Sequence, residues 1–143
     1  MDKTPKSILV VDDELLIRDL LYDFFSERDW QVTVCESADK AIEQLKNRRF
    51  EIVVVDLKLP ESDGLSLIGK IKAFFPDLPI LIVTGFPSLE SAISAVRLKV
   101  EDYIVKPFNI NKLFKTVDSI IENRRNLKKA HEEETEDYHH KRP

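Results

Sequence analysis

Five short apolar runs alternate with five segments of helical spacing, and this alternation constrains the fold more than any other feature of the chain. The apolar runs occupy residues 7–11, 31–35, 52–55, 80–83 and 102–105. The helical segments occupy residues 14–28, 38–47, 65–75, 88–98 and 110–125. Strands that alternate regularly with helices indicate crossover connections between parallel strands. We therefore predict an α/β fold built on a five-stranded parallel sheet.

The composition of the strands predicts where the helices lie. Apart from Ser7, runs 7–11, 52–55 and 80–83 are apolar throughout, which is expected of central strands whose two faces are both covered by helices. Ser37 and Ser88 precede two of the helical segments and are candidate N-caps. With 143 residues, of which 43% are hydrophobic, the chain suits a single domain with one layered core.

The helical pattern fades after Arg125, and this divides the chain into two parts. We expect a folded domain over residues 1–125 and a charged tail over residues 126–143. The tail holds four Lys or Arg and five Asp or Glu residues, with no Gly or Pro before Pro143. The last helix could therefore extend into the tail, either as a solvated helix end or as a helix that leads to, or pairs with, another element.

Composition also excludes several kinds of site. All three histidines (His131, His139 and His140) lie in the tail, so a Ser-His-Asp site or a histidine-bearing zinc site is not expected in residues 1–125. Cys35 is the sole cysteine, which excludes an internal disulfide. The net charge of −4 gives no basic field for nucleic acid. With no signal peptide and no membrane-spanning apolar run, we expect a cytoplasmic protein.

Polar residues stand at the ends of four predicted strands. Asp12 and Asp13 follow the first run, Asp56 follows the third, Thr84 follows the fourth, and Lys106 follows the fifth. Ligands of open parallel sheets bind beyond the carboxyl ends of the strands. Each residue alone has an ordinary explanation, such as a helix cap or a turn, but their agreement at four strand ends predicts a functional site.

The residue types at this edge favour phosphoryl transfer. Clustered carboxylates repel one another, and a hard cation such as Mg²⁺ relieves the repulsion through oxygen ligands. An aspartate can act as a nucleophile and form an aspartyl-phosphate. A metal, a lysine and a hydroxyl would neutralise the oxygens of the transferred group. We therefore predict a Mg²⁺-dependent site, with Mn²⁺ as a substitute, that accepts a phosphoryl group on an aspartate.

Four motifs resemble those of one family. VVDDE (residues 10–14), VVVDLKLPESDGL (53–65), ILIVTG (80–85) and DYIVKPF (102–108) are similar to the receiver domains of two-component response regulators, the CheY-like family. The resemblance covers about residues 5–125. It implies the flavodoxin-like strand order 2-1-3-4-5, with the five helices divided between both faces of the sheet.

The resemblance also implies roles for the acidic residues. Asp56 matches the phosphoacceptor. Asp12 and Asp13 match the acid pair that holds Mg²⁺, with Asp13 as the direct ligand. Asp56 itself and the backbone carbonyl of Lys58 match the positions that complete the metal site.

Further positions match the family's switch. Thr84 matches the hydroxyl that bonds the phosphoryl group, and Lys106 matches the lysine that pairs with it. Pro107 resembles the family's cis proline. Tyr103 matches the aromatic switch residue on the last strand, although a half-buried strand aromatic would explain it equally. We further hypothesise that Lys58 and Phe86, each two residues beyond a site residue, set the lifetime of the phosphate.

The resemblance implies a signalling module rather than an enzyme, although such a module assists its own phosphorylation and dephosphorylation. Its partners would be a sensor histidine kinase or a phosphotransfer protein and an output protein or domain. The output face would comprise helix four, strand five and helix five, and could also form a homodimer. No direct binding of nucleic acid or membrane is expected. The chain could equally be the receiver of a longer transcription factor, cyclase or hybrid kinase.

Other classes fit the sequence less well. An aspartyl phosphatase would carry a DxDxT motif after the first strand, where this chain reads DDELL. A flavodoxin-like cofactor binder would need a Gly/Ser/Thr-rich phosphate loop in that place. A pseudo-receiver would lack some of the site residues that are present here.

Two positions depart from the family pattern. Glycine is common in the family after the first and fourth helices, where this chain has Asp29 and Lys99. Both positions favour a left-handed backbone, which Asp tolerates better than Lys. We therefore expect Lys99 to cost some stability, or the turn to differ locally.

Overall fold

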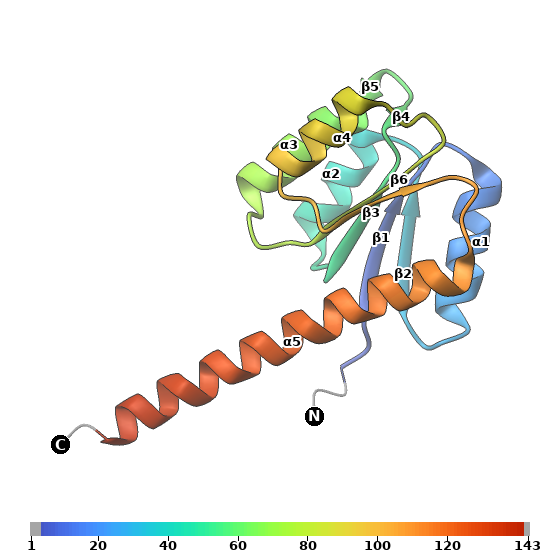
Figure 1. Ribbon diagram of the computed structural model, residues 1–143. Coiled ribbons are helices and arrows are strands. Elements are labelled where there is room, and N and C mark those ends of the chain that lie inside the picture. The colour runs from blue at the N-terminus through green and yellow to red at the C-terminus, as the bar shows by residue number, and fades with distance from the viewer. Residues whose placement is uncertain (1–3, 142–143) are drawn as a thin grey trace.

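The computed structural model describes the backbone of residues 4–141 and the side chains of residues 4–135 (Figure 1). Five parallel strands form one sheet in the order β2-β1-β3-β6-β7, which is the predicted order once a small hairpin, β4-β5, is set aside. The sheet strands are β1 (Ser7–Val11), β2 (Gln31–Cys35), β3 (Ile52–Val55), β6 (Ile80–Thr84) and β7 (Asp102–Val105). The helices are α1 (Leu15–Ser26), α2 (Ala38–Asn47), α3 (Gly64–Phe74), α4 (Leu89–Arg97) and α5 (Ile110–Lys141). The predicted fold class is confirmed.

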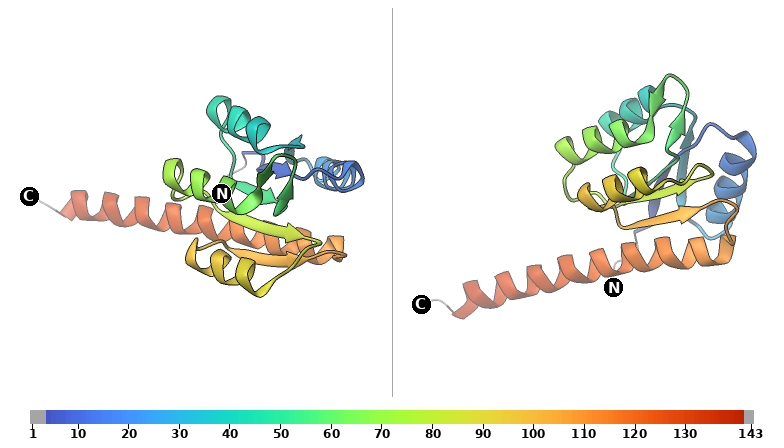
Figure 2. Two further views of the ribbon diagram at one scale, coloured as in Figure 1. Left: turned by 90° about the horizontal axis from the view of Figure 1, so that it is seen from above. Right: turned by 45° about the horizontal axis from the view of Figure 1, so that its top comes forward.

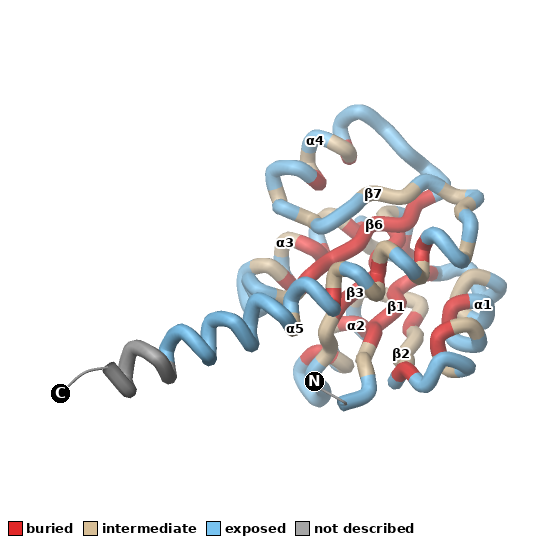
Figure 3. Tube along the Cα trace, turned by 60° about the horizontal axis from the view of Figure 1, so that its bottom comes forward, coloured by how far each residue is buried: buried red, intermediate tan, exposed pale blue. Residues whose placement is uncertain are grey.

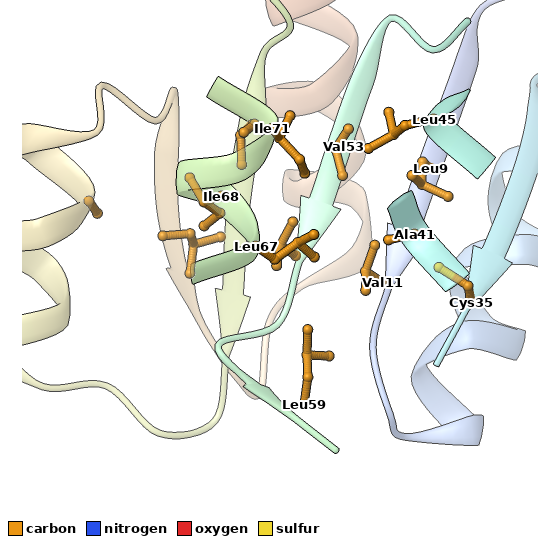
Figure 4. Packing of buried hydrophobic residues seen from close by; sticks show 14 residues of the cluster. Leu9, Val11, Cys35, Ala41, Leu45, Val53, Leu59, Leu67, Ile68 and Ile71 are labelled. Carbon is orange, nitrogen blue, oxygen red and sulfur yellow. The ribbon is translucent and has the colours of Figure 1, made fainter. Parts of the chain in front are cut away.

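The helices cover both faces of the sheet and divide the core into two clusters. Helices α1 and α5 pack on one face, where Phe25 and Val117 are fully buried. Helices α2, α3 and α4 pack on the other face, where Ala41 and Leu67 lie over β1 and β3 (Figures 2 and 4). Strands β1, β3 and β6 are buried along nearly their whole length (Figure 3). Coverage of both faces explains their continuously apolar sequence.

The connection between β3 and α3 differs from the prediction. No element was expected between the run 52–55 and the helical segment 65–75, but the structure has a two-stranded antiparallel hairpin there, formed by β4 (Lys58–Leu59) and β5 (Ser62–Asp63). Glu61 at its tip has a φ of 55°. Two-residue strands are too short for a periodic sequence signal, which explains why the pattern did not reveal them.

The helix boundaries follow local capping chemistry. The Ser37 and Ser88 side chains accept backbone N–H groups at the starts of α2 and α4, as predicted. Asp29 and Lys99 take the left-handed backbone that was expected of them, with φ values of 64° and 57°. The turn after α4 is therefore retained with lysine in a conformation that favours glycine. The predicted cis peptide bond between Lys106 and Pro107 is also present.

Helix α5 continues far beyond the folded body. Ile121 is the last buried residue among the described side chains of this helix, and Arg125 donates to both carboxylate oxygens of Glu51, at 2.7 and 2.5 Å. From residue 126 to residue 135 every side chain is exposed, and the helix projects away from the sheet (Figures 1 and 3). The helix therefore extends into the tail, as the sequence allowed. Within residues 4–141, no helix is both long and apolar enough to cross a membrane.

Candidate functional site

Backbone hydrogen bonds bring the predicted site residues to one edge of the sheet. The Asp12 N–H donates to the Cys35 carbonyl at 3.1 Å, and the Asp56 N–H donates to the Val11 carbonyl at 2.9 Å. The Lys106 N–H donates to the Thr84 carbonyl at 2.8 Å. Each bond continues the parallel ladder just past the last strand residue. These hydrogen bonds thereby align the carboxyl ends of β1, β3, β6 and β7 along the same edge of the sheet.

The ammonium group of Lys106 lies among three carboxylates. Its Nζ is 2.8 Å from Asp12 Oδ2, 3.0 Å from Asp56 Oδ2 and 2.7 Å from Glu14 Oε1. Asp12 and Asp56 are buried, whereas Glu14 is exposed. Residues that follow three different strands, β1, β3 and β7, therefore meet in a single charge cluster.

Burial and the neighbouring charges shift the pKa values of Asp12 and Lys106 in opposite directions. Burial raises the pKa of the Asp12 carboxyl, and hydrogen bonds from Lys106 and from the Glu14 backbone N–H only partly offset that effect. Burial would lower the pKa of the Lys106 ammonium, but hydrogen bonds to Asp12, Glu14 and Asp56 raise it above its ordinary value. Lys106 is consequently a permanent cation at physiological pH.

The acidic residues form a donor set suited to a hard cation. One carboxylate oxygen from each of Asp12, Asp13, Glu14 and Asp56 lies within 4.8 Å of the other three. Asp13 and Glu14 are exposed, so the cluster opens to solvent. Mg²⁺ takes oxygen ligands and usually keeps several waters. A group of four carboxylates, two of them buried and two exposed to solvent, fits that preference.

The β4-β5 hairpin packs tightly against the backbone of Asp56. The Lys58 N–H donates to Asp56 Oδ1 at 3.2 Å, and the Gly64 N–H donates to the Leu57 carbonyl at 2.8 Å. A Cβ on Gly64 would lie 2.3 Å from the Asp56 carbonyl oxygen. Only glycine allows this approach, so Gly64 sets the position of the loop beside Asp56.

Thr84 ends β6, the strand next to β3 in the sheet, and Phe86 follows two residues later. Thr84 is fully buried, and its Oγ1 accepts the Phe86 N–H at 3.1 Å. The Phe86 side chain is exposed, and the Nζ of Lys58 lies 4.1 Å from the centroid of its ring. This is a cation–π contact. The two residues predicted to set the phosphate lifetime therefore touch each other.

Tyr103 is half-buried on β7, and its ring packs against the core cluster under α2, α3 and α4. Its hydroxyl lies 2.7 Å from Ser91 Oγ on α4. The ring is therefore a packing residue whose hydroxyl has a specific partner on α4, and the switch role of Tyr103 stays a prediction.

Sequence reasoning missed Glu14, Gly64 and Ser91 as contributors to the site. Glu14 directly follows the acid pair, and that adjacency was the available signal. Gly64 is one of only three glycines, and it is the first residue of α3. The contact between Ser91 and Tyr103 left no signal, because the two residues meet only through packing of α4 on β7.

Comparison with known proteins places this geometry in a family. A family model described as "Response regulator receiver domain" matches residues 8–118. The transcriptional regulatory protein ZraR of Escherichia coli O157:H7 is 32% identical over 114 residues, which cover 80% of this chain and 26% of ZraR. The chain therefore spans about a quarter of the length of that curated relative.

Solved structures of response regulator proteins superpose well on this chain. A CheY-like receiver domain protein from Methanospirillum hungatei superposes with a TM-score of 0.84 and 26% identity, covering 87% of this chain and 99% of that one. The response regulator protein TrrA from Thermotoga maritima, solved in complex with Mg²⁺-BeF, has a TM-score of 0.73 and 30% identity and covers 80% of this chain and 98% of that one.

The chain belongs to the response regulator receiver domain family. Its members are phosphoacceptor signalling domains of two-component systems that bind Mg²⁺ and act with histidine kinases and output domains. The resemblance found in the four motifs is thereby confirmed.

Proposed function

We propose that Asp56 of this receiver accepts a phosphoryl group from a phosphohistidine on a sensor kinase or phosphotransfer protein, or from a small phosphodonor. The observation that carries the proposal is the position of the Lys106 ammonium, 3.0 Å from Asp56 and 2.8 Å from Asp12. A buried carboxylate at a strand end, next to a fixed cation, is a nucleophile in a site that favours negative charge.

The proposed transfer is an in-line displacement at phosphorus. A carboxylate oxygen of Asp56 forms a bond to phosphorus while the bond from phosphorus to the donor nitrogen or oxygen breaks, and the donor leaves with the electron pair of that bond. Lys106 offsets the negative charge that the arriving phosphoryl oxygens bring. The Lys58 N–H already bonds one oxygen of Asp56, which orients the carboxylate.

We propose that Asp13 binds Mg²⁺ directly, together with Asp12, Asp56 and the backbone carbonyl of Lys58. The donor set described above supports this assignment, since carboxylates from Asp12, Asp13 and Asp56 converge there. The bound ion would neutralise phosphoryl oxygens during transfer and hydrolysis. Glu14 is a further candidate ligand, because its carboxylate lies in the same cluster.

The proposed response begins at Thr84. Its hydroxyl now accepts the Phe86 N–H, and it would leave that bond to reach the phosphoryl group, which allows Tyr103 to move inward. The change would reach the face formed by α4, β7 and α5. Leu89, Val96 and Val105 are exposed on α4 and β7 of that face. Exposed apolar side chains of this kind support an output interface, or a homodimer, at this surface.

We propose that Lys58 and Phe86 control the lifetime of the acyl-phosphate. Their cation–π contact places an aromatic ring and a long side chain beside the loop that carries Asp56. A covered acyl-phosphate is less accessible to the water that hydrolyses it.

Mass measurement after incubation with a small phosphodonor and Mg²⁺ tests the proposed function. The wild-type chain should gain one phosphoryl group, and Asp56→Asn should gain none. Asp63→Asn is the matched control, because Asp63 lies on the same loop and caps α3, a role that asparagine retains. Failure of the wild type with both the donor and a cognate kinase would contradict the proposal.

We also propose that residues 1–125 form the receiver proper and that residues 126–143 extend α5 as a connector. The fully exposed helix after Arg125 supports this boundary, because side chains 126–135 add nothing to the core. Side chains 136–141 and residues 142–143 lie outside the described part of the chain. The second candidate role, the receiver unit of a longer regulator, is favoured by the same projecting helix, and the length of the natural gene would decide it.

A further inference from the structure

Ser91 connects Tyr103 to the first turn of α4. Its Oγ lies 2.7 Å from the Tyr103 hydroxyl, 3.0 Å from the Ser88 carbonyl oxygen and 3.0 Å from Ser88 Oγ. The Ser88 N–H donates to the same atom at 3.3 Å. A hydroxyl has one proton and two lone pairs, so it makes at most three hydrogen bonds. Four polar atoms therefore compete for three positions around Ser91 Oγ.

This small network includes the N-cap of α4. Ser88 Oγ accepts the Ser91 N–H at 3.0 Å, which completes a reciprocal capping box between Ser88 and Ser91. The Tyr103 hydroxyl makes the shortest contact in the network. Any rearrangement of Tyr103 therefore changes the hydrogen bonding of the residue that closes the helix cap.

Burial makes the contact costly to break. Ser91 is buried, at 7% exposure, and Tyr103 is half-buried against the core. At this depth water replaces a lost partner only in part, and a polar group that loses its partner in such a place is destabilising. Among the described side chains, no buried nitrogen or oxygen atom lacks a hydrogen-bond partner. In the observed orientation of Tyr103, every polar atom of this network therefore has at least one hydrogen-bond partner.

We propose that Ser91 is a positioning residue that holds the Tyr103 side chain against α4 and makes the orientation of Tyr103 and the first turn of α4 interdependent. Through Ser91, a displacement of Tyr103 loosens the α4 cap, and a displacement of the cap frees Tyr103. The consequence for signalling rests on the proposed function, in which Tyr103 moves when Asp56 is phosphorylated. The coupling itself exists in the unphosphorylated chain.

Hydrogen exchange of the unphosphorylated full chain tests the coupling. Tyr103→Phe removes only the hydroxyl and should speed exchange of the Ser91 and Ala92 amides about two- to tenfold, the range expected for one net hydrogen bond. The Ala92 N–H is a useful reporter because it donates to the Ser88 carbonyl at 3.0 Å. Tyr22→Phe is the matched control, since Tyr22 lies on α1. Unchanged exchange rates of the Ser91 and Ala92 amides in Tyr103→Phe, or an equal increase of these rates in Tyr22→Phe, would overturn the proposal.

A second measurement separates positioning from a general loss of helix stability. In Ser91→Ala, the ring NMR signals of Tyr103 should shift, whereas Ser119→Ala, an exposed serine on α5, should leave them in place. In the double variant Ser91→Ala/Tyr103→Phe, the amides of residues 91 and 92 should exchange no faster than in Ser91→Ala alone. Additive effects of the two substitutions on these exchange rates would refute the coupling. Neither measurement uses phosphorylation, so failure of phosphoryl uptake and failure of this coupling are separate results.

Discussion

Replacing Lys106 by methionine tests how the charge cluster is held together. Methionine approximates the length of the lysine stem but removes the ammonium. Asp12 and Asp56, with side chains 4% and 2% exposed, then lose their shared counter-ion. Removing one partner of a buried ion pair costs about 3–5 kcal/mol, whereas the exposed Glu14 contributes about 0–1 kcal/mol. We therefore expect Lys106→Met to lower the free energy of unfolding by about 3–5 kcal/mol at neutral pH.

Urea denaturation followed by Trp30 fluorescence measures this loss, because Trp30 is buried and is exposed on unfolding. Lys58→Met is the control: it removes an exposed cation and should cost less than about 1 kcal/mol. A loss below about 1 kcal/mol in Lys106→Met would refute the reasoning, because it would mean that the carboxylates are stable without their counter-ion.

The pH dependence of the same variant gives an independent check. Burial already raises the pKa of Asp12, and removing Lys106 raises it further. A carboxyl whose folded pKa lies above its unfolded value penalises the folded state when it is ionised, and the penalty disappears as the pH falls through the folded pKa. The deficit of Lys106→Met should therefore shrink as the pH is lowered from neutral through the raised pKa of Asp12. A deficit that does not change as the pH is lowered would contradict the electrostatic explanation.

Four further predictions concern Gly64, the Cys35 thiol, the Phe86 side chain and the fluorescence of Trp30. Gly64→Ala places a Cβ 2.3 Å from the Asp56 carbonyl oxygen and should cost about 1–3 kcal/mol in urea denaturation; an unchanged midpoint would contradict the close approach. Burial raises the pKa of the Cys35 thiol to about 11, so the folded state binds more protons than the unfolded state. Stability should fall as the pH rises from about 9 to 11, and Cys35→Ala should remove that part of the fall. Phe86→Ala should shorten the lifetime of the phosphorylated form, measured by the decay of the phosphorylated mass, and an equal or longer lifetime would disprove shielding. Trp30, which precedes β2 at the end of the sheet away from the site, should show no large quench when Mg²⁺ is added, and a strong quench would contradict its placement.

The sequence by itself determined which segments form the strands, because its signals are local and periodic, whereas the strand order followed from the family resemblance. Runs of apolar residues marked the strands, and the residues directly after them marked the carboxyl edge. Parallel strands bring those ends together whatever the details of packing, so Asp12, Asp56, Thr84 and Lys106 could be placed at one edge from spacing alone. The left-handed positions Asp29 and Lys99 were predicted from the family resemblance, because the family commonly has glycine in these two places.

Tertiary structure alone decided which side chains touch within that layout. The third carboxylate on Lys106, the contact of Lys58 with Phe86 and the bond between Ser91 and Tyr103 join residues that are distant in sequence and share no periodic pattern. Such contacts depend on how α4 and the β4-β5 hairpin pack against the strand ends. Periodicity shows which face of an element is buried, but the meeting of two particular side chains is set by distances of a few tenths of an ångström that only the packed chain defines.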